Sequence, residues 1–380
     1  MTVQAFSRKP LRVNWGEGSV ARLAEELDRV GSRRPMVVCT PSVARNGDLL
    51  HLIERSARRA LSGVVSDVRP HSPIETVRMV AGRLASADSV VVVGGGSAIV
   101  TARAANILCC EGGDVEMLAT RRDTGGGLTS PRLTARKLPM VIVPTTPTTA
   151  APKAGAAVTR QGAASRLALF DPAARARCVI IDPELTAGAP VTVTRDAALN
   201  ALVMAFEGLT TRRRNLFADA ALGHAARQLP ARIGMLATRP NDSALRVELA
   251  LLAVLVGDGT DSSGGGLTAA LSHSVGHRVQ AHNGVVDALL LPHVLRLVTR
   301  RDPSALASIA ELLAVVPMDV TQAVEEILAP LSKLRTLREL GVLEDDLPLL
   351  VGAAMDDFAS RGATFRVEDR DVERLLKEAL

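Results

Sequence analysis

Several short segments in the first half of the sequence contain continuous apolar runs, without the polar–apolar alternation of a half-solvated strand. They are PMVVCT (35–40), GVVSDV (63–68), the valine-rich segment 88–93, PMVIVP (139–144) and CVIID (178–182). Segments with helical periodicity lie between them, as at Val20, Leu23, Leu27 and Val30. Strands that are apolar on both faces and alternate with helices predict a parallel sheet covered by helices on both sides.

The second half of the sequence has a different pattern. From Thr194 to the C-terminus, Ala- and Leu-rich helical segments are separated by short polar breaks, with no strand-length run of β-branched residues. A chain of 380 residues is long enough for two domains. We therefore expect an α/β domain at 1–183 followed by an all-helical domain at 184–380. The segment 112–137, rich in Arg, Thr and Gly, predicts an excursion at the sheet edge.

Composition excludes several classes of function. The net charge is only +5 and 2% of residues are aromatic, so neither the charge nor the stacking side chains of a nucleic-acid-binding protein are present. The N-terminus lacks a signal pattern and no apolar window is long enough for a membrane helix, so we expect a cytoplasmic protein. The four cysteines lie in apolar segments without paired spacing, which predicts reduced thiols: Cys39, Cys109, Cys110 and Cys178.

Two helix boundaries can be predicted from local signals. Residues 47–62 have a helical pattern. SPIE (72–75) predicts a helix to about Ala85, with Ser72 as N-cap, Pro73 at the first helical position and Glu75 completing a capping box.

Glycines and a serine follow the valine-rich strand directly, at Gly94, Gly95, Gly96 and Ser97. Such a turn at the carboxyl end of a parallel strand lets backbone approach a phosphate, while the next helix aims its free N–H groups at it. It is not the GxGxxG pattern, and a simple tight turn is the alternative interpretation.

A threonine-rich loop, PTTPTTA (144–150), follows a later strand. Its hydroxyls could bind the same anion or a ribose, although a solvent-exposed loop is also compatible with the sequence. They belong to Thr145, Thr146, Thr148 and Thr149.

Together these motifs resemble the iron-containing alcohol dehydrogenase family. GGGS, PTT, IIDPELTAGAP (180–190), ALNALVMAFEG (198–208) and HNGVVDALLLPHV (282–294) occur in that family's order and spacing. The resemblance spans nearly the whole chain. It implies an N-terminal dinucleotide-binding α/β domain, a C-terminal helical domain, and hydride transfer with NAD or NADP in the cleft between them.

The resemblance also implies a metal site whose ligands this chain lacks. The family holds a divalent metal with one aspartate and three histidines, and the matching positions here are Asn200, Met204, Ala269 and Asn283. An amide, a thioether and a methyl group are poor donors for such an ion, so we expect no metal. The alternative is a zinc site formed by His273, His277 and His282, which have suitable spacing.

His273 is the catalytic candidate. The resemblance places a non-ligand histidine there beside the nicotinamide, where an imidazole can exchange the hydroxyl proton as hydride moves. A hydrogen-bonded packing role is the alternative. The glycines at 264–266 open the same predicted helix, whose N-terminus could face an anionic substrate group. The candidate substrate residues are Asn200, His277, His282 and Asn283, whereas His293 is expected to pack.

The cofactor residues follow from the two loops and from the resemblance. The candidates are Thr40, Gly94, Gly95, Gly96, Ser97, Thr145, Thr146, Thr149 and Arg166, the last replacing a lysine near the ribose. No carboxylate follows the second strand, where Pro41, Ser42 and Arg45 stand, so NADP is allowed as well as NAD. Arg103 stands where the family has a lysine, and Val100 where it has an aspartate.

Within this superfamily, the metal-free maleylacetate reductases resemble the chain at Asn200, at Thr40–Pro41 and at RPHSP (69–73). They reduce a carbon–carbon double bond conjugated to a carboxylate, but they keep histidines at the positions of Met204, Ala269 and Asn283. We therefore expect a metal-independent NAD(P)-dependent oxidoreductase acting on a small alcohol, a carbonyl compound, an unsaturated carboxylate or a modified peptide end. The alternatives are a metal-dependent enzyme using the shifted histidines and a non-catalytic relative that binds nucleotide or protein. A homodimer is compatible with the sequence, which does not fix the stoichiometry.

Overall fold

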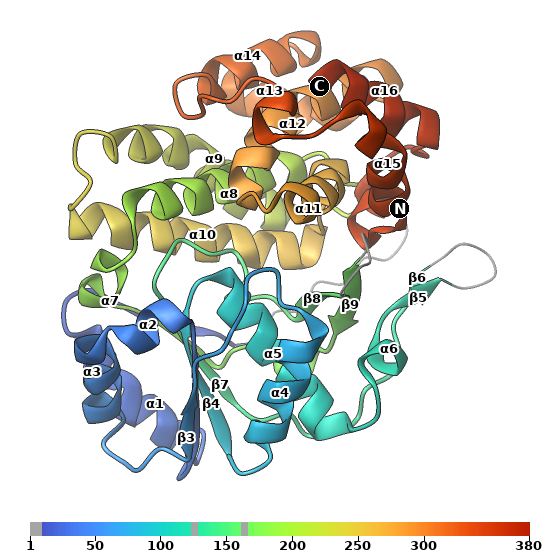
Figure 1. The fold of residues 1–380 in the computed structure, drawn as a ribbon. Helices are drawn as coiled ribbons and strands as arrows, with labels where there is room; N and C mark the ends of the chain where they lie inside the picture. The colour runs from blue at the N-terminus through green and yellow to red at the C-terminus, as the bar shows by residue number, and fades with distance from the viewer. Residues whose placement is uncertain (1–9, 123–127, 161–165) are drawn as a thin grey trace.

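The computed structural model describes residues 10–122, 128–160 and 166–380 (Figure 1). Within these residues a parallel sheet of six strands has the order β1-β10-β7-β4-β2-β3. The strands are β1 (Arg12–Trp15), β2 (Pro35–Cys39), β3 (Gly63–Val65), β4 (Ser89–Gly94), β7 (Met140–Pro144) and β10 (Cys178–Ile181). The expected parallel sheet is confirmed. The sequence did not predict β1, and β3 ends at Val65, earlier than expected.

Helices cover both faces of the sheet, as the apolar strands require. Along β4, Val91 and Val93 face one core cluster, whereas Val90 and Val92 face another. The first cluster includes α1 (Leu23–Arg29) and α3 (Gly47–Ala57), and the second includes α4 (Ile74–Leu84) and α5 (Gly96–Glu111). The short helix α2 (Pro41–Arg45) follows β2.

Two predicted helix boundaries are wrong. The helix expected at 47–62 ends at Ala57, because Arg58 adopts a left-handed conformation with φ of 50°. Ser72 is not an N-cap: α4 begins at Ile74 with Pro73 as its cap residue, and Ser72 itself has φ of 52°. The Ser72 hydroxyl instead donates to the backbone oxygen of Ser97, at 3.2 Å. It therefore ties this loop to the first turn of α5.

Two antiparallel hairpins were not predicted. The excursion at 112–137 contains α6 (Val115–Leu118), β5 (Arg121–Arg122) and β6 (Leu128–Thr129), and residues 123–127 lie outside the described part. The other hairpin pairs β8 (Gly155–Thr159) with β9 (Arg166–Phe170) and places Arg166 opposite Thr159. Figure 1 shows this second hairpin next to the helical layer.

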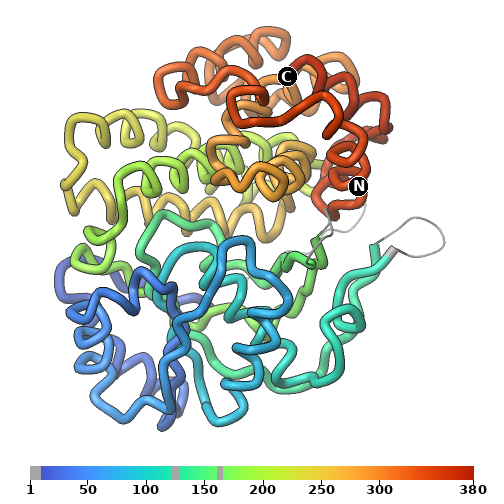
Figure 2. The backbone as a smooth tube through the Cα atoms, viewed as in Figure 1, coloured from blue at the N-terminus to red at the C-terminus, as the bar shows by residue number. Residues whose placement is uncertain are grey.

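From residue 182 to the C-terminus, all of which the structure describes, the secondary structure is helical, as expected (Figure 2). The α-helices are α7 (Pro183–Ala187), α8 (Val191–Gly208), α9 (Leu216–Met235), α10 (Ser243–Ser263), α11 (Leu267–Val279), α12 (Asn283–Arg301), α13 (Ala307–Leu313), α14 (Val320–Leu328), α15 (Leu347–Asp356) and α16 (Asp369–Ala379). Short 3₁₀ helices include η1 (Ser19–Arg22), η2 (Pro172–Ala174), η3 (Pro303–Leu306), η4 (Pro317–Asp319), η5 (Arg338–Leu340), η6 (Glu344–Asp346) and η7 (Phe358–Gly362). One large apolar cluster joins α8–α16.

The cysteines are free thiols, and Cys39 and Cys178 are buried in the sheet. Burial raises the pKa of Cys39 to about 11 and that of Cys178 to about 12, so both thiols stay protonated and weakly nucleophilic.

Among the described residues, no single helix combines the length and the apolar composition needed to cross a bilayer. Only the bent pair Pro303–Leu313 and Pro317–Leu328 meets those two criteria, and only when its halves are taken together.

Candidate active site

The carboxyl ends of β2, β4 and β7, which are neighbours in the sheet, bring the predicted cofactor loops together. A Cβ atom added to Gly94 would lie 3.2 Å from Cγ2 of Thr40, and one added to Gly95 would lie 2.9 Å from Oγ1 of Thr146. The glycines therefore allow the threonine loop and Thr40 to close on the turn. The same absence of side chains leaves backbone exposed to a ligand.

The cap residue of α5 is Gly95, which has no side chain to accept a hydrogen bond from the N–H groups of the first turn. Gly94 has φ of 150°, a conformation that residues with side chains rarely adopt. A glycine turn leading into a 16-residue helix without a side-chain cap fits the pyrophosphate of a dinucleotide.

A buried arginine fixes the threonine loop from behind. Arg103, on α5, is 0% exposed and donates to the backbone oxygens of Ala150, Ala151 and Gly155 at 2.9–3.1 Å. Burial lowers its pKa to about 10, so it remains charged at neutral pH. Its contacts give it a positioning role toward this loop and toward β8.

The helical part of the chain packs directly on this loop. A Cβ atom at Gly257, on α10, would lie 2.2 Å from the backbone oxygen of Thr149. The Thr149 hydroxyl donates to the sulfur of Met204, on α8, at 3.3 Å. Of the predicted cofactor residues, Thr149 thus faces the helices.

His273 lies on α11 and is paired with a carboxylate. Its Nδ1 is 2.8 Å from Oδ2 of Asp357, the residue that precedes η7. Asp357 is held by the backbone N–H of Ala359, which donates to its Oδ1 at 2.8 Å. Burial, followed by the charge of Arg166, lowers the pKa of His273, and Asp357 opposes both effects. The imidazole is therefore neutral at neutral pH, while 19% of its side chain stays exposed.

Arg166 is close to two further histidines. It contributes, after burial, to lowering the pKa of His71 to about 4 and to lowering the pKa of His277. The rings of His71 and His277 are arranged edge to face, with centroids 6.3 Å apart. Arg166 was predicted to lie near the ribose and His277 near substrate, whereas His71 was missed.

The positions of the family's metal ligands form a different set of contacts. Asn200 donates through Nδ2 to Oδ2 of Asp287 at 2.6 Å, and Met204 accepts from Thr149. Asn283 begins α12 beside Gly276, and Ala269 offers only a methyl group. Burial raises the pKa of Asp287 to about 7, against its bonds with Asn200 and Ser272. These donors do not fit a divalent metal ion.

Two histidines of the alternative zinc site, His273 and His282, are bonded to different aspartates. His282 places Nδ1 2.9 Å from Oδ2 of Asp196, a contact that raises the pKa of His282. His273 is bonded to Asp357. Across the described residues, no group of three or more His, Cys, Asp or Glu side chains is arranged to hold a metal ion.

The N-terminus of α11 does not face a substrate anion, contrary to the prediction. Glu207, on α8, accepts from the backbone N–H groups of Gly266, Thr268 and Ala269. This carboxylate therefore satisfies the free donors at the end of the helix. Glu207 lies in ALNALVMAFEG (198–208), one of the segments that resemble the family, but the sequence does not indicate this contact.

His293 lies on α12 within 3.3 Å of Arg296, and burial lowers its pKa to about 4. This packing role agrees with the expectation.

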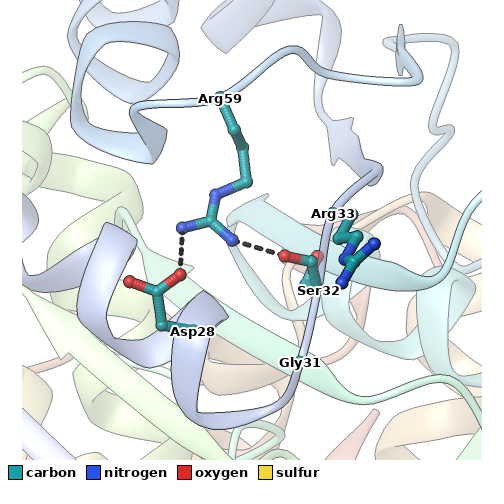
Figure 3. A pocket seen from close by; sticks show the side chains of 5 residues that line it. All are labelled: Asp28, Gly31, Ser32, Arg33 and Arg59. Carbon is teal, nitrogen blue, oxygen red and sulfur yellow. Dashed lines mark hydrogen bonds and ion pairs between the residues drawn. The ribbon is translucent and has the colours of Figure 1, made fainter.

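A surface hollow of about 430 Å³ lies elsewhere, lined by Asp28, Gly31, Ser32, Arg33 and Arg59 (Figure 3). Arg59 reaches across it to Asp28 at 2.7 Å and to the backbone oxygen of Ser32. The hollow adjoins the start of β2, at the edge of the sheet opposite the glycine turn. Because ligands of parallel sheets bind at the carboxyl ends of the strands, the turn is a better candidate site than this hollow.

Comparison with known proteins agrees with this geometry. The family model for "Iron-containing alcohol dehydrogenase" matches residues 10–183, and that for "Fe-containing alcohol dehydrogenase family, C-terminal" matches residues 194–380. The chain is 28% identical over 355 residues to maleylacetate reductase of Rhizobium sp. (strain MTP-10005), covering 92% of this chain and 90% of the relative. It is 28% identical over 380 residues to 4-hydroxybutyrate dehydrogenase of Cupriavidus necator, covering 96% of each.

Solved structures show the same fold. The crystal structure of maleylacetate reductase from Agrobacterium tumefaciens superimposes with a TM-score of 0.79 at 26% identity, covering 100% of this chain and 98% of that one. The two family models together span nearly the whole chain. The chain therefore belongs to the iron-containing alcohol dehydrogenase family.

Proposed function

We propose that this protein transfers hydride between NAD(P) and a small alcohol, carbonyl compound or unsaturated carboxylate, without a metal ion and with His273 exchanging the proton. That it is a dehydrogenase or reductase follows from its family, because both family models match and its relatives are named dehydrogenases and reductases. The observation that carries the proposal is the His273–Asp357 pair, which lies near enough to Arg166 and Lys153 of the α/β part for both to lower the pKa of His273.

The nucleotide would bind at the carboxyl ends of β2, β4 and β7. Gly94–Gly96 and the first turn of α5 provide backbone donors for the pyrophosphate, and Thr40 and Thr146 border the same turn. When bound, the nicotinamide supplies or accepts the hydride. No carboxylate stands at residues 40–46 to disfavour a 2′-phosphate, so the proposal includes both NAD and NADP.

Asp357 would hold His273 in one tautomer. With Nδ1–H donating to the carboxylate, Nε2 carries the lone pair and can accept the hydroxyl proton during oxidation of an alcohol. In reduction the protonated ring returns that proton to the product. The lowered pKa of His273 favours the neutral base, which is the form required for oxidation.

No step of this proposal uses a metal, because the donors at the family's ligand positions do not fit one. Asn200 is a neutral amide whose N–H group donates to Asp287. Met204 offers a soft thioether sulfur, and Ala269 has no atom that can bind a metal. Polarisation of a substrate oxygen then depends on protein donors alone.

The test combines nucleotide titration with metal analysis. Purified protein is titrated with NADH and NADPH while nicotinamide fluorescence is followed, and bound iron and zinc are measured by elemental analysis. We expect saturable nucleotide binding, substoichiometric metal and turnover that survives a chelator. Stoichiometric metal whose removal abolishes turnover would overturn metal independence, and absence of nucleotide binding would overturn the proposal as a whole.

A further inference from the structure

Arg166 is a buried cation with one N–H group, at Nε, that has no hydrogen-bond partner among the described residues. It is the first residue of β9. A buried guanidinium without an acceptor is unfavourable, because the charge has lost its water and gained nothing in exchange. Such a group is expected to have a ligand.

The carboxylates nearest to Arg166 are committed elsewhere. Asp357 and Asp287 both act on the arginine electrostatically, but neither forms an ion pair with it in the described structure. Asp357 binds His273 and the N–H of Ala359, and Asp287 accepts from Asn200. These carboxylates offset part of the charge of Arg166, but they are not paired with it.

Two neutral imidazoles face the same space. His277, on α11, has a buried Nδ1 without a hydrogen-bond partner among the described residues, and its ring lies edge to face with that of His71. Arg166 is close enough to influence both rings. Arg166, His277 and His71 thus come together from β9, α11 and the loop before α4, and two of their nitrogens, Arg166 Nε and His277 Nδ1, have no partner among the described residues.

The loop that carries His71 is held in a strained conformation. His71 and Ser72 have φ of 60° and 52°, in the left-handed region that residues with side chains rarely adopt. Thr159 holds the backbone oxygens of both residues, and Ser72 is bonded to Ser97. These hydrogen bonds hold His71 in place between the first turn of α5 and α11.

We propose that Arg166, together with His71 and His277, binds a carboxylate of the substrate, so that this enzyme acts on a hydroxy acid or oxo acid rather than on a plain alcohol. This inference rests on the proposed function, because it assigns the substrate class of the same site. The planar guanidinium matches a carboxylate through two parallel hydrogen bonds, which gives orientation as well as affinity. The carboxylate would be held near His273, whose pKa the same arginine influences.

Malonate is the probe, because it carries carboxylates and no reactive carbonyl. Its binding to the NADH-loaded protein is measured by calorimetry for the wild type, Arg166→Gln, Arg166→Lys and His277→Asn. We expect Arg166→Gln to weaken malonate binding about 10- to 100-fold and Arg166→Lys to weaken it less, with NADH binding weakened much less than malonate binding in each variant. The matched control is Arg160→Gln, because Arg160 follows β8 in the same hairpin, is exposed and pairs with Glu116.

The outcomes separate the two proposals. Wild-type protein that binds NADH but not malonate, or an Arg166→Gln variant that binds malonate as well as wild type, would overturn the carboxylate site alone. A variant that loses NADH affinity but keeps malonate affinity would assign Arg166 to the nucleotide and also overturn it. Turnover of succinic semialdehyde with a kcat/KM well above that of butanal, lost in Arg166→Gln, would support it. Failure of wild type to bind any nucleotide would instead overturn the proposed function.

Discussion

Nδ1 of His273 and Oδ2 of Asp357 lie 2.8 Å apart although 84 residues separate them in the sequence. Asp357 is itself buried and fixed by a backbone N–H, so it cannot follow the imidazole if the ring turns. A carboxylate on one ring nitrogen sets the tautomer and leaves the other nitrogen for chemistry. The pair is therefore compatible with the acid–base role proposed for His273, and variants of Asp357 test that role.

Asp357→Asn should reduce kcat about 10²- to 10⁴-fold, because an amide can donate to Nδ1 and stabilise the wrong tautomer. The affinity for NADH should not change, since Asp357 does not border the glycine turn. Single-turnover kinetics and NADH titration measure the two effects separately. The control is Asp356→Asn, which removes an exposed carboxylate at the preceding position. Equal losses in the two variants would contradict the positioning role.

The pH dependence of kcat/KM for alcohol oxidation should follow the protonation of the His273 imidazole. Burial and Arg166 lower the pKa of His273, Lys153 acts in the same direction, and Asp357 opposes them. The neutral base is required, so kcat/KM should fall on the acidic side as the ring becomes protonated, below the usual histidine range.

Two variants should move the acidic limb of the profile, where kcat/KM falls as His273 becomes protonated, in opposite directions. Arg166→Gln removes a cation that disfavours the imidazolium ion, so the pKa of His273 rises and the limb moves to higher pH. Asp357→Asn removes the carboxylate that favours the imidazolium ion, so the limb moves to lower pH. Profiles of kcat/KM from about pH 5 to 9 measure both shifts. Shifts of the same sign would show that another group controls the limb.

Gly95→Ala should weaken nucleotide binding about tenfold or more while the protein remains folded. The new methyl group would meet Oγ1 of Thr146 at 2.9 Å and push that hydroxyl away from the turn. NADH titration measures the loss. Gly82→Ala, on α4, is the control, because a Cβ there meets nothing within 4 Å. A normal NADH affinity in Gly95→Ala would place the nucleotide elsewhere.

The strands of the sheet were predictable where they are buried on both sides. Continuous apolar runs such as Val90–Val93 have no other location than the centre of a sheet with two covered faces. Strand β1 was missed because it lies at the edge, and its segment RVNW is only four residues long with a polar residue at every second position, unlike the apolar runs of the inner strands. The β8–β9 hairpin was missed for a similar reason, since half-buried residues alternate with buried ones along β8.

Candidate site residues could be chosen from the sequence only where a single residue or motif has a recognisable signal of its own. His273 was identified through the family resemblance, and the glycines through their position after a strand. Asp357 and His71 were missed because their significance depends on contacts between distant elements, which a single sequence does not reveal. The helix end at Gly266 was misinterpreted because the carboxylate that occupies it belongs to Glu207, 59 residues earlier.

Gly257 lies where helix α10 packs on the threonine loop at Thr149. Gly257→Ala would place a methyl group 2.2 Å from the backbone oxygen of Thr149, and neither the helix α10 nor the loop can yield by rotating a side chain. Moving α10 away should lower the free energy of unfolding by about 3 kcal/mol and also weaken nucleotide binding, because the threonine loop shifts with it. Urea denaturation and NADH titration measure both. Gly352→Ala, on α15, meets nothing within 4 Å and should leave both unchanged or slightly raise stability. If Gly257→Ala lowered stability but left nucleotide affinity intact, the threonine loop would not couple the helices to the cofactor.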